Sequence, residues 1–141
     1  MTVPDFLDTN VLVYAYDTSA PEKRRIAQDL VRRAVAGEMV ISTQVLAEFA
    51  ATLLHKLTPT VRPEDVTDVL DALGPIKTVT PDGGVVRRAV EARAQYGVHF
   101  WDGMIVAAAE RGHCARIWSE DLNAGQEYFG VVVENPFRRS Q

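Results

Sequence analysis

The chain lacks the features that mark secreted and membrane proteins. Cys114 is its single cysteine, so no disulfide can form within the chain, and we expect a reducing, cytoplasmic location. No apolar run reaches the roughly 18 residues of a transmembrane helix, so no membrane partner is expected. Asp5 and Asp8 interrupt the stretch where a secretory signal would carry its apolar segment.

Several catalytic motifs are also missing. There is no Gly-x-Ser-x-Gly nucleophile elbow, no phosphate-binding P-loop, and no Gly-x-Gly-x-x-Gly after the first expected strand. The three histidines His55, His99 and His113 do not have the spacing of zinc ligands, with each other or with Cys114. These absences argue against common hydrolases, nucleotide-binding enzymes and zinc proteins. The favoured interpretation of His99 is a structural, hydrogen-bonded histidine, and contact with a substrate is the alternative.

The chain has fewer basic than acidic residues. The chain has 15 lysines and arginines against 19 aspartates and glutamates, a formal net charge of −4. A protein that holds nucleic acid by charge alone would be basic. Any contact with nucleic acid must therefore be local or assisted by a metal ion.

The pattern that is present is an alternation of short strands and helices. With 141 residues and 47% hydrophobic residues, the chain suits a single domain, residues 1–141, with a full core. Short apolar stretches predict strands at 3–7, 39–41, 76–79, 115–118 and 131–133. Helical patterns lie between them, including a very apolar helix over 104–109, and residues 136–141 read as a loose polar tail. This order predicts an α/β fold, a three-layer α/β/α sandwich with a parallel sheet of about five strands.

Four carboxylates fall where such a sheet binds ligands. Asp8 and Asp121 directly follow expected strands, Asp102 opens a helix, and Glu48 lies near the start of another. The carboxyl ends of parallel strands and the helix N-termini lie along one edge, so these side chains are expected to converge there. Each has a simpler interpretation. Asp8 alone favours a helix N-cap, Asp102 suits a cap, Glu48 suits a wet helix face, and Asp121 suits a turn.

Asp102 favours a functional site over these simpler interpretations, because its sequence neighbours are too apolar for an ordinary exposed surface carboxylate. Carboxylates gathered in one crevice repel each other unless a cation lies among them. An all-oxygen ligand set selects Mg²⁺, with Mn²⁺ as the alternative, and such an ion can promote phosphodiester hydrolysis. The pattern thus predicts a metal-dependent enzyme acting on phosphodiester bonds.

The motifs together resemble the PIN-domain ribonucleases, and most of all the VapC-type toxins of bacterial toxin–antitoxin pairs. The resemblance spans nearly the whole chain and rests on motifs in a fixed order: Asp8-Thr9-Asn10, Glu48, Phe100-Trp101-Asp102, Ser119-Glu120-Asp121-Leu122, Gly125-Gln126 and the ending Val133-Glu134-Asn135-Pro136-Phe137. It implies a Mg²⁺-dependent endoribonuclease, an antitoxin partner that masks the site, and a homodimer.

The resemblance also implies roles for single residues. Asp8 and Asp102 would be the principal metal ligands, and Glu48 and Asp121 would complete the catalytic acidic cluster. Thr9, Asn10 and Ser119 would orient ligands or water.

Two other function classes remain open at this point. One is phosphoryl transfer through an aspartyl phosphate, as in haloacid-dehalogenase-like phosphatases, although their second aspartate is replaced here by Asn10. The other is a non-enzymatic RNA- or protein-binding module whose acids only cap helices.

Overall fold

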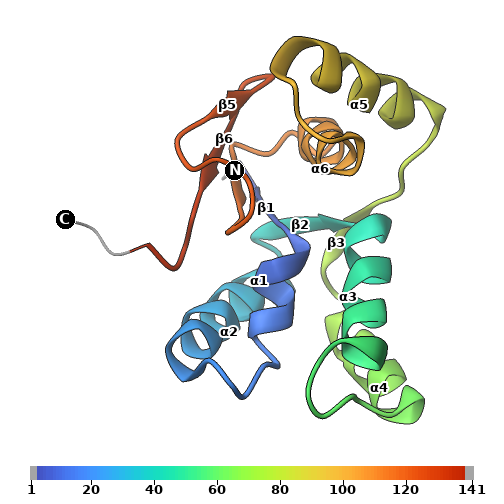
Figure 1. Ribbon diagram of the computed structural model, residues 1–141, viewed down its shortest axis with the longest axis vertical. Helices are drawn as coiled ribbons and strands as arrows, with labels where there is room; N and C mark the ends of the chain where they lie inside the picture. Colours follow the sequence, from blue (N-terminus) through green and yellow to red (C-terminus); the bar gives the residue numbers. More distant parts are fainter. Residues whose placement is uncertain (1–2, 139–141) are drawn as a thin grey trace.

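A six-stranded sheet forms the centre of the computed structural model, which describes residues 3–138 (Figure 1). Its order is β3-β2-β1-β4-β6-β5, and every neighbouring pair is parallel except the antiparallel pair β5 and β6. The strands are β1 (Asp5–Leu7), β2 (Met39–Ser42), β3 (Lys77–Val79), β4 (Arg116–Trp118), β5 (Glu127–Tyr128) and β6 (Val131–Glu134). The predicted α/β fold is confirmed; the sheet has one strand more than the five expected segments, the two-residue β5.

Helices cover both faces of the sheet. Figure 1 shows α5 (Gly83–Tyr96) and α6 (Phe100–Arg111) on one side, with the other four helices across the sheet from them. Those four are α1 (Thr9–Tyr14), α2 (Pro21–Val35), α3 (Thr43–His55) and α4 (Pro63–Leu73). Because both faces are covered, β1 and β2 are buried along their whole length, and all their residues except Asp5 and Ser42 are apolar. This is the predicted three-layer sandwich.

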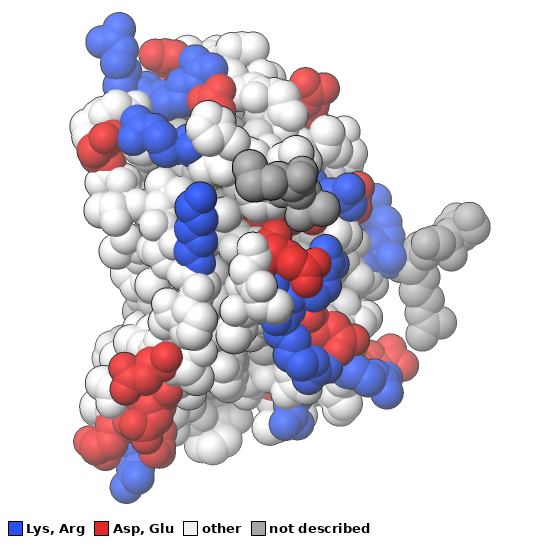
Figure 2. All heavy atoms as spheres, turned by 180° about the vertical axis from the view of Figure 1, so that it is seen from behind, with Lys and Arg blue, Asp and Glu red and all other residues white. Residues whose placement is uncertain are grey.

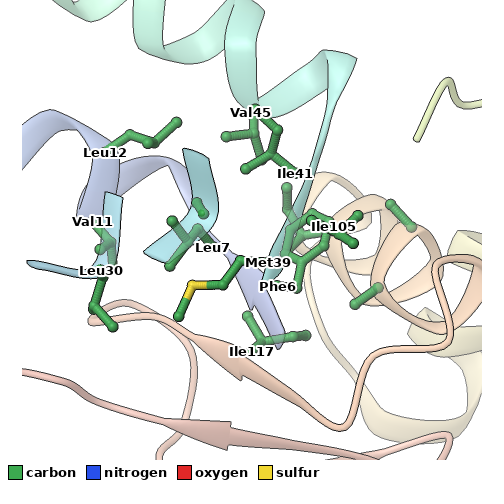
Figure 3. Packing of buried hydrophobic residues seen from close by; sticks show 14 of the residues in the cluster. Phe6, Leu7, Val11, Leu12, Leu30, Met39, Ile41, Val45, Ile105 and Ile117 are labelled. Carbon is green, nitrogen blue, oxygen red and sulfur yellow. The ribbon is translucent and has the colours of Figure 1, made fainter. Parts of the chain in front are cut away.

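The core packs around β1, which lies between β2 and β4. Phe6 and Leu7 are fully buried, and Met39, Ile41 and Ile117 from the neighbouring strands lie close to them (Figure 3). Burying a side chain of this size contributes about 1.5–3 kcal/mol. The packing fixes the end of β1, and with it the position of the residue that follows.

The helix predicted over 104–109 begins four residues earlier than expected. α6 starts at Phe100 and its N-cap is His99, whose side chain accepts from the backbone N–H of Trp101. Asp102 therefore lies inside the first turn and is not a cap. Gly103 follows it because α5 passes very close: a Cβ at Gly103 would lie 2.8 Å from the carbonyl oxygen of Ala89.

The surface carries both signs of charge. Figure 2 shows acidic side chains gathered over α4, which has four exposed acids: Glu64, Asp65, Asp68 and Asp71. Among the helices that residues 3–138 form, none combines the length and apolar character needed to span a bilayer.

Candidate active site

The site begins where β1 ends, at Asp8. Its side chain is 7% exposed, although it is a carboxylate. The hydroxyl of Ser119 donates to Asp8 Oδ2 at 2.7 Å, and the backbone N–H of Thr9 donates to Oδ1 at 2.7 Å. The second bond makes Asp8 the N-cap of α1, as one sequence interpretation held. The first joins the end of β1 to the segment that follows β4.

That segment is held in place by Ser119 and Asn10. The Ser119 oxygen accepts from the backbone N–H groups of Asp121 and Leu122, both at 3.2 Å. The Asn10 carbonyl oxygen accepts from the N–H of Glu120 at 3.1 Å, and its amide nitrogen lies 3.5 Å from both Asp8 Oδ2 and Ser119 Oγ. The backbone next to Asp8 thus carries Asp121 at a fixed place beside it.

The environment of Asp8 disfavours its charge. Burial raises the pKa of Asp8 from its ordinary value of 3.8 to about 6, against the hydrogen bonds from Ser119 and Thr9, which lower it. The negative charges of Asp121 and Glu48 raise it further. Three of the four predicted carboxylates therefore interact electrostatically.

The fourth carboxylate, Asp102, is half-buried at the start of α6. Burial raises its pKa, the neighbouring His99 acts in the opposite direction, and the charge of Asp121 raises the pKa again. Asp121 is therefore the acid whose charge reaches both Asp8 and Asp102. The sequence predicts that all four acids lie at one edge of the sheet. In the structure, Asp8 interacts electrostatically with Asp121 and Glu48, and Asp102 interacts with Asp121.

Gln44 lies at the site but was not predicted from the sequence. Its amide nitrogen donates to Glu48 Oε1 at 2.9 Å and to the backbone carbonyl of Trp101 at 3.2 Å, so it links α3 to the start of α6. Glu48 itself is exposed. Trp101 is also 56% exposed, not a core residue. Only the folded chain brings these segments, 57 positions apart, together.

Two hollows of about 440 Å³ each meet at Asp121. The first, which we call the Glu48 hollow, lies between α1 and α3 and extends from Asp121 past Glu48 to Lys56. The second, the Asn123 hollow, lies on the side of Asp102 and is lined by the end of α5 and the segment that follows β4. Asp121 lines both hollows. The acidic centre, by which we mean Asp8, Glu48, Asp102 and Asp121, therefore adjoins two spaces that open to solvent.

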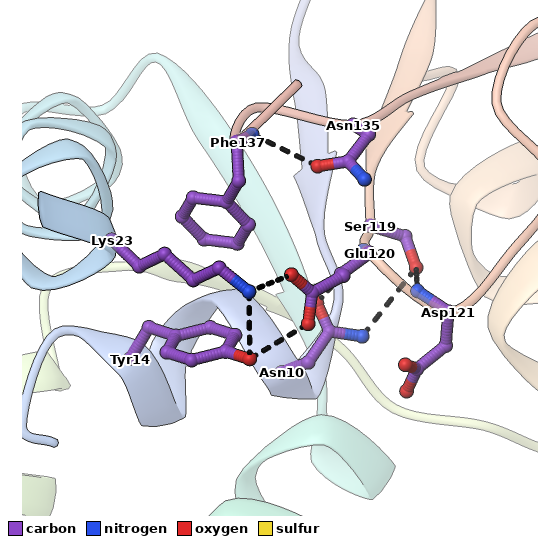
Figure 4. Close-up of polar contacts among 8 residues, drawn as sticks. All are labelled: Asn10, Tyr14, Lys23, Ser119, Glu120, Asp121, Asn135 and Phe137. Carbon is purple, nitrogen blue, oxygen red and sulfur yellow. Dashed lines mark hydrogen bonds and ion pairs between the residues drawn. The ribbon is translucent and has the colours of Figure 1, made fainter. Parts of the chain in front are cut away.

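A polar cluster beside the Glu48 hollow was not predicted. Lys23 Nζ lies 2.5 Å from Glu120 Oε2, and the Tyr14 hydroxyl donates to Glu120 Oε1 at 2.7 Å. Desolvation works to raise the pKa of Glu120, but these two hydrogen bonds outweigh it, and the pKa is lowered. Figure 4 shows Glu120 turned toward Lys23 and Tyr14, while the carboxylate of Asp121 points away from them.

The same cluster corrects the expectation of a loose tail. Phe137 packs edge-to-face against Tyr14 with ring centroids 4.9 Å apart, and its N–H donates to Asn135 Oδ1 (Figure 4). Its aromatic side chain finds apolar cover there, whereas a polar residue would not. The end of the expected tail, residues 139–141, lies outside the described residues.

In the part of the chain that the structure describes, the four acids form no ion pair with lysine or arginine. No ion pair within residues 3–138 involves Asp8, Glu48, Asp102 or Asp121. Many other acids do pair with arginine, such as Glu110 with Arg88 and Asp82 with Arg111. Unpaired carboxylates close to one another are costly unless something positive joins them.

The residues present suit a hard divalent cation in their chemistry. The four carboxylates offer oxygen ligands, and the buried Thr9 hydroxyl next to Asp8 forms no hydrogen bond within residues 3–138. Across residues 3–138, however, no three acid, histidine or cysteine side chains are already arranged around one ion position. Glu48 and Asp121 are exposed, so their side chains can rotate toward an ion bound at Asp8.

Comparisons with known proteins agree with this architecture. The sequence model of the PIN domain matches residues 6–126. A toxin–antitoxin complex from Klebsiella pneumoniae has a similar structure at 19% identity, with 96% of this chain and 99% of that chain covered and a TM-score of 0.71. DNA-bound VapBC from Salmonella typhimurium is 18% identical, with 96% and 99% covered and a TM-score of 0.69.

A third solved structure has a similar fold. VapC20 from Mycobacterium tuberculosis, described as a sarcin–ricin-loop-cleaving toxin, is 14% identical, with 83% and 91% covered and a TM-score of 0.65. No curated protein sequence matches this chain.

Proposed function

The chain belongs to the PIN-domain family, and from that premise we propose that it is a metal-dependent endoribonuclease that hydrolyses phosphodiester bonds in RNA. The observation that carries the proposal is the acidic centre formed by Asp8, Glu48, Asp102 and Asp121. The charge of Asp121 reaches buried Asp8 and half-buried Asp102, that of Glu48 reaches Asp8, and no ion pair within residues 3–138 neutralises any of the four. The nuclease activity agrees with the cleaving toxin VapC20, which shares the fold.

Asp8 and Asp102 are the residues we assign to hold the ion, and Glu48 and Asp121 complete the catalytic set. A bound Mg²⁺ or Mn²⁺ would supply a water of lowered pKa and neutralise charge on the phosphodiester. Ser119 and Asn10 keep Asp8 and the backbone of Asp121 in fixed positions. Thr9 contributes a buried hydroxyl beside them.

We also propose that the protein is the toxin of a toxin–antitoxin pair. The support is that several structures with this fold are toxin–antitoxin complexes covering at least 93% of this chain. The cognate antitoxin would be a protein that binds over the acidic centre. A homodimer and a cytoplasmic location complete the proposal.

The two competing functions fit the structure less well. In a haloacid-dehalogenase-like site the residue at position 10 would be an acid, but Asn10 here uses its amide to join Asp8, Ser119 and Glu120. For a module whose acids only cap helices, Asp102 has no function, because His99 is the cap of α6.

The test is cleavage of total RNA by the purified protein with and without Mg²⁺, followed by mapping of the cut ends. Asp8→Asn should abolish metal-dependent cleavage while circular dichroism shows an intact fold. The matched control is Asp68→Asn on the acidic surface of α4, which should cleave like the wild type. Full activity in Asp8→Asn, or a phosphoryl group trapped on Asp8, would reject the proposal.

A further inference from the structure

The Asn123 hollow has a chemistry that the proposed reaction does not yet use. It adjoins the acidic centre, because Asp102 and Asp121 are among its lining residues. Building on the proposed endoribonuclease function, we propose that this hollow binds one unpaired nucleobase of the RNA, next to the phosphodiester that is cut. The hollow would then determine which base the protein accepts beside the cleavage position.

The charge of the hollow favours a neutral group. Its lining contains two carboxylates, Asp102 and Asp121, and neither lysine nor arginine is among the described residues that line it. A phosphate placed there would meet the repulsion of these two carboxylates. A nucleobase carries no charge at neutral pH, so it fits where the backbone does not. The Glu48 hollow differs, since Lys56 lines it and can meet a phosphate.

The hydrogen-bonding groups of the hollow suit the edge of a base. Three exposed amide side chains line it, Gln95, Asn123 and Gln126, and an amide offers a donor and an acceptor side by side. Asparagine and glutamine recognise base edges through this pair, and proteins read unpaired RNA bases by hydrogen bonds to those edges. The 440 Å³ volume lies in the range of small-ligand sites.

The Tyr96 hydroxyl adds a directed donor. Its oxygen accepts from the side-chain amide of Gln95 at 3.1 Å and from the N–H of Phe129 at 3.0 Å. With both lone pairs used, the hydroxyl hydrogen is left to donate, and it forms no hydrogen bond within residues 3–138. A base carbonyl or ring nitrogen in the hollow would accept it.

The wall that carries Asn123 is held rigidly. The N–H of Gln126 donates to the carbonyl of Asn123 at 3.1 Å, and two further backbone bonds join Gly125 and Gln126 to Val133 of β6. Gly125 has a φ of +86°, which favours glycine at this turn. A site that selects among bases needs such fixed positions.

The experiment uses the full chain, Mg²⁺ and a pool of short single-stranded RNAs of random sequence, with every cut end sequenced. The wild type should show a base preference at one position beside the cut. Asn123→Ala and Gln95→Ala, from opposite walls, should each weaken that preference about fivefold or more while cleavage continues. Gln28→Ala is the matched control, an α2 amide that lines neither hollow, and it should keep the preference.

The outcomes separate this inference from the proposed function. If the wild type cuts neither total RNA nor the pool with Mg²⁺ or Mn²⁺, the endoribonuclease proposal fails and the base site with it. If it cuts total RNA but not the pool, the endoribonuclease stands and a site for an unpaired base is wrong. If it cuts without any base preference, or if both variants retain the wild-type preference, the endoribonuclease stands and the base site is wrong. The last result is also what a hollow reserved for a protein partner would give.

Discussion

Ser119 donates a 2.7 Å hydrogen bond to Asp8, and this contact joins two residues 111 positions apart at the centre of the candidate site. It links the ends of the adjacent parallel strands β1 and β4. The same Ser119 oxygen accepts from two backbone N–H groups of the segment that carries Asp121. One buried hydroxyl thus sets the positions of two acids.

Ser119→Ala should destabilise the protein by about 1–3 kcal/mol, because it leaves a buried carboxylate and two N–H groups without their partner. RNA cleavage should fall as well, since Asp121 loses its anchor. Urea unfolding and cleavage rates measure the two effects. Ser19→Ala, at an exposed serine, is the control and should change stability by less than about 0.5 kcal/mol. Equal stability of the two variants would contradict the role of Ser119.

Asp8 should make the stability of the metal-free protein depend on pH. Its pKa is about 6 in the folded state and 3.8 ordinarily, so the folded state holds the proton more tightly. The contribution favours folding below pH 4 and is lost as pH rises to 6 and above. At about 1.4 kcal/mol per pH unit, the loss is about 3 kcal/mol.

Asp8→Asn removes this contribution. The stability of the variant minus that of the wild type should therefore grow by about 2 kcal/mol between pH 4 and 7.5, whatever its starting value, because part of the change already lies below pH 4. Urea unfolding in EDTA at several pH values measures the difference. A difference that stays constant over this range would show that burial of Asp8 does not shift its titration.

Lys23→Met should slow RNA cleavage roughly tenfold while changing stability by less than about 1 kcal/mol. The side chains of Lys23 and Glu120 are partly exposed, so their ion pair adds little to folding. Removal of the Lys23 ammonium group leaves Glu120 without its ion pair. Because Asp121 is the next residue, the position of the Asp121 carboxylate becomes less fixed. Arg24→Met is the control: Arg24 is the next residue of α2 and is exposed. Unchanged cleavage in Lys23→Met would mean that the cluster serves only the fold.

Gly103→Ala should lower stability by about 1–3 kcal/mol, because the new Cβ meets the backbone of α5 at Ala89. The shift of α6 also moves Asp102, so cleavage should decrease. Gly83→Ala is the control at the start of α5, where a Cβ has no atom within 4 Å. Thermal unfolding compares the two, and similar melting temperatures would contradict the close approach of α5 and α6.

Much of the fold could be predicted from the sequence, because local patterns determine it. Short, mostly apolar strands alternating with helices favour a parallel sheet covered on both sides, and β1 and β2 are buried in that way. β5 was missed because it has two residues and exists through pairing with β6. The start of α6 was missed because its cap is His99, an uncommon N-cap residue.

Some residues of the candidate site could be predicted from the sequence, and others could not. Asp8 and Asp121 could be located because residues that follow parallel strands share one edge of the sheet. The contact between Lys23 and Glu120 spans 97 positions, and that of Gln44 with Trp101 spans 57. Such pairs depend on how helices cross, which no local pattern encodes. Composition likewise gave no indication of the Asn123 hollow, whose walls come from α5 and the segment after β4.

The central claim is that Asp8 and Asp102 hold one hard divalent cation. An anomalous difference map from crystals of the protein soaked in Mn²⁺ tests it most directly. The account predicts a peak in contact with the carboxylates of both residues, and its absence in crystals of Asp8→Asn. A peak elsewhere, or no peak at saturating Mn²⁺, would contradict it.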